Sequence, residues 1–130
     1  MDNRKIVIIE DSRDVASFLD MAIQTLGYET AVAYDGAAAV DLLHQTIPDL
    51  ILLDIYLPDL NGDVILRHVR ATDRLDKVPV VVLTGESQML SKEVEKQANF
   101  TLIKPIDFQT LSQLIIRILL KTESGIPIRD

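Results

Sequence analysis

Short apolar runs alternate along the chain with longer segments in which apolar residues recur every three to four positions. Continuous apolar runs are typical of strands buried on both faces of a parallel sheet, whereas a run of mixed polarity is typical of an edge strand. The mixed run here is Tyr28–Tyr34. The apolar runs are Ile6–Ile9, Leu50–Leu53, Val78–Leu83 and, less purely, Phe100–Ile103. Together they predict five strands, with Tyr28–Tyr34 at an edge of the sheet.

The segments between these runs carry the 3.6-residue period of helices that bury one face. Local residues mark several helix ends: Gly27 suits the left-handed position after a helix, and Asp35 and Asn61 are predicted N-caps. The fourth helix has only a thin apolar stripe. The predicted helices cover Val15–Leu26, Gly36–Gln45, a stretch from Gly62 to Val69, about Gln88–Ala98 and about Phe108 to Leu120.

Strands and helices that alternate in this way form β–α units, whose crossover connections are almost always right-handed. The natural packing is an α/β fold, with a doubly wound parallel sheet and helices on both of its faces. A length of 130 residues suits one domain of this kind. We expect residues 1–121 to form that domain and residues 122–130, with Gly125 and Pro127, to be a C-terminal tail or the start of a linker.

The composition argues against several classes of partner and site. Asp and Glu total 20 and Lys and Arg total 13, so the net charge is −7, which disfavours binding to nucleic acid or to an anionic membrane surface. The absence of cysteine rules out disulfides, thiolate metal sites and cysteine nucleophiles. The run Ile6–Ile9 is too short for the apolar core of a secretory signal, and no run is long enough to span a membrane. A cytoplasmic protein is therefore expected.

Polar residues stand where the buried runs stop. Glu10 and Asp11 follow the first run, Asp54 follows the third, Thr84 the fourth and Lys104 the last. Because the strands of a parallel sheet point the same way, these side chains should meet at the carboxyl edge, where open α/β sheets bind their ligands. Residues spread from position 10 to position 104 are thereby predicted to form one site.

The chemistry of this site follows from its charge. Three crowded carboxylates repel one another, so one of them holds a proton or a cation binds between them. Oxygen ligands without His or Cys select a hard ion, with Mg²⁺ the physiological choice and Mn²⁺ or Ca²⁺ as substitutes. Lys104 adds a second positive charge for a phosphate group, and the Thr84 hydroxyl can donate to a phosphoryl oxygen. Asp54, central in the sheet, is the predicted nucleophile, which would form an acyl phosphate.

In this order, each at the end of its strand, the motifs resemble those of the response-regulator receiver domains (CheY-like) of two-component signal transduction. They are Glu10-Asp11, the segment Asp54–Gly62 (DIYLPDLNG), Thr84-Gly85 and Lys104-Pro105. The resemblance covers about Lys5 to Leu120. It implies a flavodoxin-like fold, with strand order 2-1-3-4-5 and five helices.

The resemblance also implies a role for each site residue. Asp54 would accept a phosphoryl group from the phosphohistidine of a sensor histidine kinase or phosphotransfer protein, and Thr84 and Lys104 would hold its oxygens. The Lys104–Pro105 peptide bond would be cis. Such a domain is a switch and not an enzyme, since it turns over only its own acyl phosphate. The ligands of Mg²⁺ would be Glu10, Asp11, Asp54 and the backbone carbonyl of Tyr56.

Two features depart from the family pattern. The position three residues before the lysine usually holds an aromatic side chain that couples to the threonine as a switch, and here it holds Thr101. The neighbouring Phe100 should point to the opposite face of the sheet. The interval from Thr84 to Lys104 is also short, so the fourth helix is expected to be truncated. Phosphorylation chemistry survives both departures, but the usual route of signal transmission is in question.

Signal output is expected through the fourth helix, the fifth strand and the fifth helix. Their surface would change on phosphorylation and bind a partner or a second copy of the chain. Ile116 and Leu120 lie beside the predicted core stripe of the fifth helix. They either face a partner or are covered by Ile126 and Ile128 of the tail, and the sequence leaves both alternatives open.

Other functions compete with a phosphorylated switch. A phosphorylation-independent pseudo-receiver would act only as a protein-binding module, and Thr101 is its support. A phosphatase of the haloacid dehalogenase type would also use an aspartate nucleophile and Mg²⁺, but it needs a second aspartate at the position of Tyr56. Nucleotide binding is disfavoured because the five glycines have neither P-loop nor dinucleotide-binding spacing. The basic residues between positions 67 and 77 and the two histidines, His44 and His68, are expected on the solvated surface.

Overall fold

The chain forms a five-stranded parallel sheet in a computed structural model that describes residues 3–85 and 90–124. The strand order is β2-β1-β3-β4-β5, and each neighbouring pair is parallel. The strands are β1 (Lys5–Ile9), β2 (Glu29–Ala33), β3 (Leu50–Asp54), β4 (Val80–Thr84) and β5 (Phe100–Ile103). The predicted α/β fold and the strand order implied by the resemblance are therefore confirmed.

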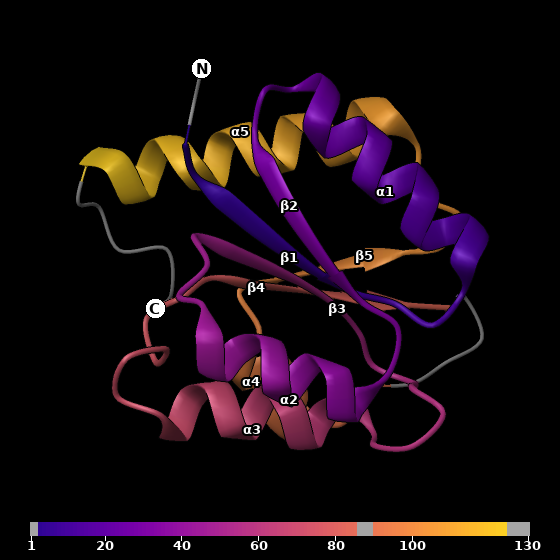
Figure 1. Cartoon of the computed structure of the whole chain (residues 1–130), viewed down its shortest axis with the longest axis vertical. Coiled ribbons are helices and arrows are strands. Elements are labelled where there is room, and N and C mark those ends of the chain that lie inside the picture. The colour runs from indigo at the N-terminus through magenta and orange to yellow at the C-terminus, as the bar shows by residue number, and fades with distance from the viewer. Residues whose placement is uncertain (1–2, 86–89, 125–130) are drawn as a thin grey trace.

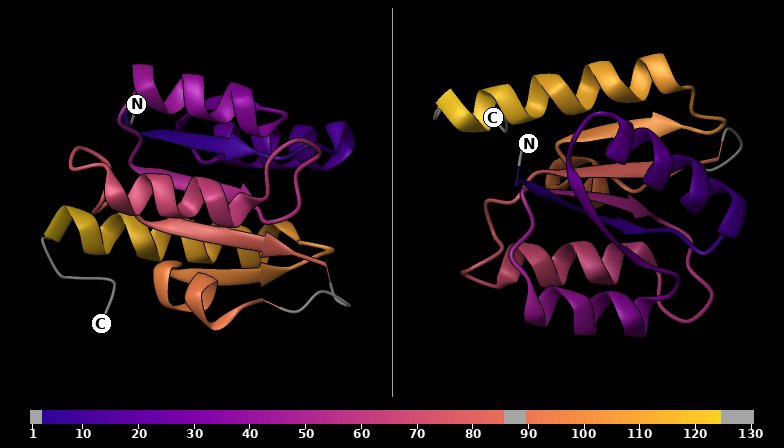
Figure 2. Two further views of the ribbon diagram at one scale, coloured as in Figure 1. Left: turned by 90° about the horizontal axis from the view of Figure 1, so that it is seen from below. Right: turned by 45° about the horizontal axis from the view of Figure 1, so that its top comes forward.

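Five helices in the described part of the chain cover the two faces of this sheet. Figures 1 and 2 show α1 and α5 on one face and α2, α3 and α4 on the other. The helices are α1 (Arg13–Thr25), α2 (Gly36–Gln45), α3 (Gly62–Ala71), α4 (Lys92–Gln97) and α5 (Phe108–Ser124). Among the residues that the structure describes, no helix combines the length and the apolar character needed to cross a membrane.

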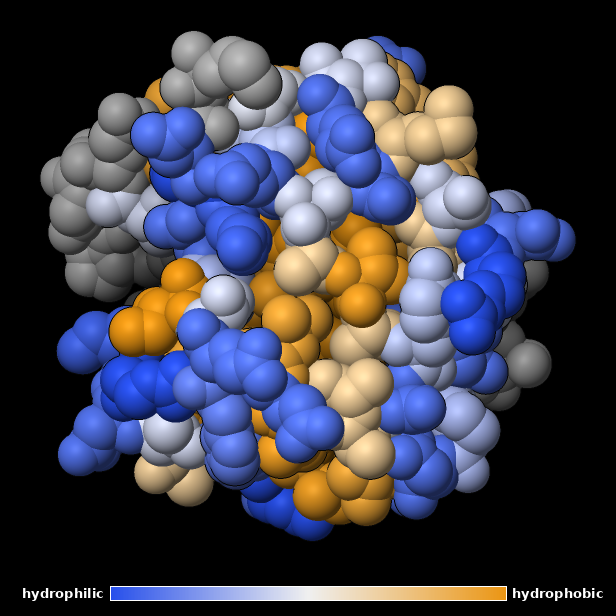
Figure 3. All heavy atoms as spheres, viewed as in Figure 1, coloured by the Kyte–Doolittle hydropathy of each residue, from blue (hydrophilic) through white to orange (hydrophobic). Residues whose placement is uncertain are grey.

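The central strands are buried on both faces, which explains their continuous apolar sequence. In β1, Val7 and Ile9 pack into the layer that contains α2, α3 and α4, whereas Ile6 and Ile8 pack into the layer that contains α1 and α5. The apolar residues of β3 and β4 alternate in the same way, without exposure to solvent. The edge strand β2 is only partly covered, and Figure 3 shows apolar side chains at the surface there, between α1 and α2. The mixed polarity of this strand correctly predicted an edge position.

Side-chain caps fix the start of several helices. Asp35 accepts a hydrogen bond from the backbone N–H three residues later in α2, at 2.8 Å, as predicted. Ser12 and Ser91 cap α1 and α4 in the same way, at 3.3 and 3.2 Å, and neither cap was predicted. Asn61 occupies the N-cap position of α3, but its side chain makes no capping hydrogen bond. Gly27 has a φ of 94°, in the left-handed region predicted for it.

The helix α4 is shorter than the stretch Gln88–Ala98 predicted for it. It begins at Lys92, because Ser91 has extended backbone and caps it, and Ala98 is again extended. The predicted first residues fall partly on positions 86–89, which lie outside the described residues. The six-residue length of α4 agrees with the truncation expected from the short interval between β4 and β5.

The helix α5 is longer than predicted and ends at Ser124 instead of Leu120. No glycine or proline interrupts the helical pattern before Gly125, and this explains the additional turn. The domain boundary expected after residue 121 stays a prediction, as does the role of the tail, whose residues 125–130 lie outside the described part of the chain.

Arg70 of α3 ties together segments that are distant in sequence. Its guanidinium group donates four hydrogen bonds of 2.7–3.0 Å. The acceptors are the backbone carbonyls of Asp76, Val78 and Gln97 and the side-chain oxygen of Asn99. Nearby, Arg74 donates to the carbonyl of Leu43 at the end of α2, at 2.7 Å. This basic stretch is therefore more than the solvated face that was predicted.

We predict that Arg70→Met lowers the free energy of unfolding by about 2–4 kcal/mol, because several carbonyls lose a charged donor at once. The matched control is Arg67→Met, since Arg67 pairs with Asp63 across 3.5 Å at the surface. That change should alter the free energy of unfolding by less than about 0.5 kcal/mol. Urea unfolding followed by circular dichroism measures both variants, and equal losses would contradict a structural role specific to Arg70.

Candidate functional site

The register of the sheet brings the predicted polar residues to one edge. Asp54 is the last residue of β3 and pairs with Leu83 of β4, so that Thr84 is the last residue of its own strand one position further on. Glu10 directly follows β1, and Lys104 directly follows β5. Parallel strands in this register end together, and the side chains predicted to meet at the carboxyl edge do lie there.

Three carboxylates form the centre of this edge. Glu10, Asp11 and Asp54 each offer an oxygen atom, and these oxygens lie within 4.8 Å of one another. Glu10 and Asp54 are buried, whereas Asp11 is exposed. The backbone N–H of Ser12 donates to Glu10 Oε2 at 3.1 Å, and the N–H of Tyr56 donates to Asp54 Oδ1 at 3.0 Å. The backbone thus fixes the orientation of both buried carboxylates.

Lys104 supplies the positive charge that faces this cluster. Its Nζ atom lies 2.7 Å from Glu10 Oε1 and 3.1 Å from Asp54 Oδ2. Burial alone would lower the pKa of Lys104, but the hydrogen bond with Glu10 and the negative charges of Asp54 and Glu10 outweigh it and raise that pKa. The ammonium group therefore stays charged, and it joins the first and third strands of the chain to the fifth.

One ammonium group does not balance three carboxylates. Burial raises the pKa of Glu10 from 4.5 to about 7; the bonds from Lys104 and Ser12 oppose this rise, and the charge of Asp54 adds to it. Oxygen donors without nitrogen or sulfur, two of them buried, match the ligand preference of a hard divalent cation such as Mg²⁺. The residues present therefore fit such an ion.

The segment after β3 is held tightly beneath the site. Tyr56 and Asn61 form an isolated antiparallel bridge, and the N–H of Gly62 donates to the carbonyl of Ile55 at 2.7 Å. A Cβ atom on Gly62 would lie 2.6 Å from the carbonyl oxygen of Asp54 and from Cα of Ile55. Glycine is thus required at this position by close approach of the backbone.

The last two strands present the remaining site residues. Thr84 is buried, and its carbonyl accepts a 2.8 Å hydrogen bond from the backbone N–H of Lys104, so the two residues are adjacent. The Lys104–Pro105 bond is cis, as the resemblance implied. Thr101 is exposed, and Phe100 packs into the opposite layer with α1 and α5. The prediction that Phe100 points away from the face of Thr101 is confirmed, and no aromatic side chain of β5 shares that face.

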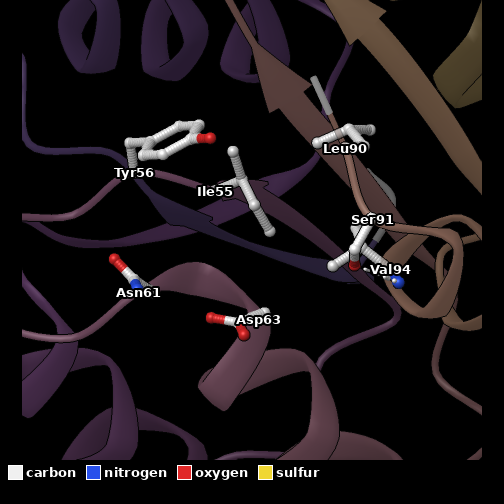
Figure 4. A pocket seen from close by; sticks show the side chains of 7 residues that line it. All are labelled: Ile55, Tyr56, Asn61, Asp63, Leu90, Ser91 and Val94. Carbon is white, nitrogen blue, oxygen red and sulfur yellow. Dashed lines mark hydrogen bonds between the residues drawn. The ribbon is translucent and has the colours of Figure 1, made fainter. Parts of the chain in front are cut away.

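A cavity of about 180 Å³ lies beside the acidic site, between the segment after β3 and α4. In Figure 4, Asn61 and Asp63 enter it from the start of α3, and Leu90, Ser91 and Val94 line it from the side of α4. Its volume is below the ~300–1,000 Å³ typical of sites for organic ligands. This cavity therefore does not suit a nucleotide or a flavin.

The two histidines take no part in the acidic site. Both lie in the last turns of their helices, His44 in α2 and His68 in α3, and so at the opposite edge of the sheet. Their ring centroids are 5.7 Å apart. This position agrees with the prediction that they lie away from the carboxyl edge.

Comparison with known proteins points to one family. A family model described as response regulator receiver domain matches residues 6–116. The signal receiver domain of a signal transduction histidine kinase from Syntrophus aciditrophicus is 30% identical, with a TM-score of 0.78 over 89% of each chain. The chemotaxis response regulator CheY4 of Vibrio cholerae is 25% identical, with a TM-score of 0.80 over 90% of this chain and 99% of that one.

A third solved structure contains a metal ion. It is the receiver domain of sensor histidine kinase PA1611 from Pseudomonas aeruginosa PAO1, with a magnesium ion coordinated in the active site cleft. This domain is 27% identical, with a TM-score of 0.82 over 91% of this chain and 98% of that one. Similarity to these proteins extends over nearly the whole described chain.

We predict that Gly62→Ala lowers the free energy of unfolding by about 1–3 kcal/mol, because the added methyl group forces the backbone of Ile55 to shift. The control is Gly27→Asn, at a left-handed position where a Cβ atom meets nothing within 4 Å and asparagine is tolerated. Urea unfolding compares the two variants. If Gly62→Ala is as stable as Gly27→Asn, the close approach of the Asp54 and Ile55 backbone to Gly62 is contradicted.

We also predict that Glu10 makes the protein less stable as the pH rises in the absence of divalent cations. Between about pH 4.5 and 7 the folded state binds more protons than the unfolded state, so the free energy of unfolding falls across this window. Across this window the free energy of unfolding of the wild type should fall by at most about 3 kcal/mol relative to that of Glu10→Gln, whose side chain stays neutral. Urea unfolding with a chelator at several pH values tests this, and a difference independent of pH would contradict it.

Proposed function

The chain belongs to the response regulator receiver domain family, and from that premise we propose that it is the phosphoacceptor of its two-component system. Asp54 would take a phosphoryl group from the phosphohistidine of a sensor histidine kinase or phosphotransfer protein. The observation that carries the proposal is the position of Asp54: its Oδ2 atom lies 3.1 Å from Lys104 Nζ, and its carboxylate lies with those of Glu10 and Asp11 in a group whose oxygens are within 4.8 Å of one another.

The transfer needs one bond to form and one to break. An oxygen of Asp54 forms a bond to phosphorus while the nitrogen–phosphorus bond of the donor breaks, and the donor imidazole keeps the electron pair and takes up a proton. Lys104 would exchange one of its carboxylate contacts for a phosphoryl oxygen, and the Thr84 hydroxyl would donate to another. These residues mainly position the group and neutralise its charge.

A divalent cation supplies the remaining positive charge. Mg²⁺, with Mn²⁺ or Ca²⁺ as substitutes, would neutralise the phosphoryl oxygens when bound. The residues that would hold it are Glu10, Asp11, Asp54 and the backbone carbonyl of Tyr56. Burial of Glu10 and Asp54 supports this assignment, since two buried carboxylates and one lysine leave a net negative charge.

Catalysis would be limited to the phosphorylation and dephosphorylation of Asp54 itself. Tyr56 stands where a phosphatase of the haloacid dehalogenase type needs a second aspartate, and the adjoining cavity is small. A phosphorylation-independent pseudo-receiver is the alternative, favoured by the exposed Thr101 at the switch position. Each position of the acidic site holds the residue type that the resemblance leads us to expect, and this argues for the phosphorylated switch.

Output through α4, β5 and α5 is part of the proposal. α4 is weakly anchored, because Val94 is its one buried residue and a cavity of about 180 Å³ separates it from Ile55. Phosphorylation would draw Thr84 inward and shift this helix. The surface that changes would bind a partner or form a homodimer.

The apolar side chains on this surface support an interaction with another protein. Ile103, Ile116 and Leu120 are 60%, 41% and 58% exposed among the described residues. Whether Ile126 and Ile128 cover the last two concerns residues outside the described part of the chain. A cytoplasmic location, and the absence of nucleic-acid and membrane partners, remain predictions from the sequence.

We predict that acetyl phosphate adds one phosphoryl group to the protein when Mg²⁺ is present, and that Asp54→Asn abolishes the addition. Intact-protein mass spectrometry measures it, with Asp63→Asn as the control because Asp63 lies outside the acidic site, at the start of α3. An adduct that persists in Asp54→Asn, or that forms equally in a chelator, would contradict the proposal. No adduct, and no spectral response to beryllofluoride, would favour the pseudo-receiver.

A further inference from the structure

The loop between β3 and α3 (residues 55–61) is fastened to the start of α2. Asp59 Oδ1 accepts a hydrogen bond of 2.7 Å from the backbone N–H of Gly36, and Oδ2 accepts one of 3.0 Å from that of Ala37. These are the first two residues of α2, whose N–H groups have no partner within the helix. Figure 1 shows α2 and α3 side by side, so this contact joins two neighbouring β–α units.

The contact between this loop and α2 is also steric. Gly36 is buried, and a Cβ atom on it would lie 2.6 Å from Cβ of Leu60. The loop therefore rests directly on the first residue of α2. The hydrogen bond from the Gly36 N–H has the largest effect on the pKa of Asp59 and lowers it from the ordinary value of 3.8. Burial opposes this change, but the hydrogen bond from Ala37 adds to the lowering, so this carboxylate is charged at neutral pH.

The same loop carries a group of the acidic site. Its backbone N–H at Tyr56 orients the Asp54 carboxylate, at 3.0 Å, and the Tyr56 carbonyl is the proposed metal ligand. The bridge between Tyr56 and Asn61 closes the loop, so Asp59 lies between its two ends. A displacement of Asp59 must therefore be taken up within a few residues of Tyr56.

We propose that Asp59 is a positioning residue of the metal site, which holds the Tyr56 backbone in place by binding the start of α2. The inference rests on the proposed function, because it takes the Tyr56 carbonyl as a ligand. Capping of α2 does not depend on Asp59 alone, since Asp35 already accepts from the next N–H of the helix, at 2.8 Å. The additional cap, the Asp59 carboxylate, comes from the loop between β3 and α3. Its loss should therefore affect the position of that loop, which the loss of Asp35 should not.

The test is a titration of ¹⁵N-labelled protein with MgCl₂, followed by NMR. Asp59→Ala should weaken Mg²⁺ binding about 10-fold, the effect typical of losing a group that supports a metal ligand. Asp59→Asn, which keeps a side-chain acceptor, should recover part of that affinity. Asp35→Ala is the matched control, because it removes a cap of the same helix and leaves the loop contact intact. In metal-free protein, Asp59→Ala should also speed amide hydrogen exchange at Gly36 and Ala37.

A second variant changes the α2 side of the contact between the loop and the helix. Gly36→Ala introduces a better helix former but displaces Leu60, so Mg²⁺ affinity should fall even though α2 gains helical propensity. If the wild type binds Mg²⁺ and is phosphorylated, but Asp59→Ala and Asp35→Ala bind Mg²⁺ with equal affinity, this inference is overturned and the proposed function is not. A wild type that fails to bind Mg²⁺ would overturn the proposed function and this inference together.

Discussion

Three carboxylates whose oxygens lie within 4.8 Å of one another face a single ammonium group at the carboxyl edge of the sheet. In a partly buried site this excess of negative charge is unfavourable: burial raises the pKa of Glu10, and the negative charge of Asp54 adds to the rise. The arrangement persists because backbone N–H groups and Lys104 hold both buried carboxylates in place. In the proposed function, the same imbalance would give the site its affinity for a cation and, through that cation, for a phosphoryl group.

The rest of the fold supplies a rigid frame for this charge on one side and a loosely held element on the other. β1, β3 and β4 are buried between two layers of helices, so Glu10, Asp54 and Thr84 lie at or directly after the ends of strands that have little freedom to move. α4, by contrast, has six residues and one buried side chain. In the proposed function, a change of charge at the rigid edge would be transmitted to α4, the helix that is weakly anchored beside it.

Much of this could be predicted from the sequence because it depends on local patterns. Continuous apolar runs predicted the buried strands, and the common direction of parallel strands predicted that residues from Glu10 to Lys104 would meet. Strand alternation also placed Phe100 and Thr101 on opposite faces correctly. The bonds made by Arg70 and Asp59 could not be foreseen, because they join elements far apart in sequence and leave no periodic signal. Helix ends were missed where a serine cap or the absence of a helix breaker decides them.

The most direct test of this account is the free energy of unfolding at pH 8 as a function of MgCl₂ concentration, with NaCl of equal ionic strength as the reference. If the crowded carboxylates bind a divalent cation, stability should rise as single-site binding requires, by about 2.7 kcal/mol at a hundredfold excess over the dissociation constant. NaCl should have no comparable effect. Stability that is unchanged by MgCl₂, or raised equally by NaCl, would contradict the account.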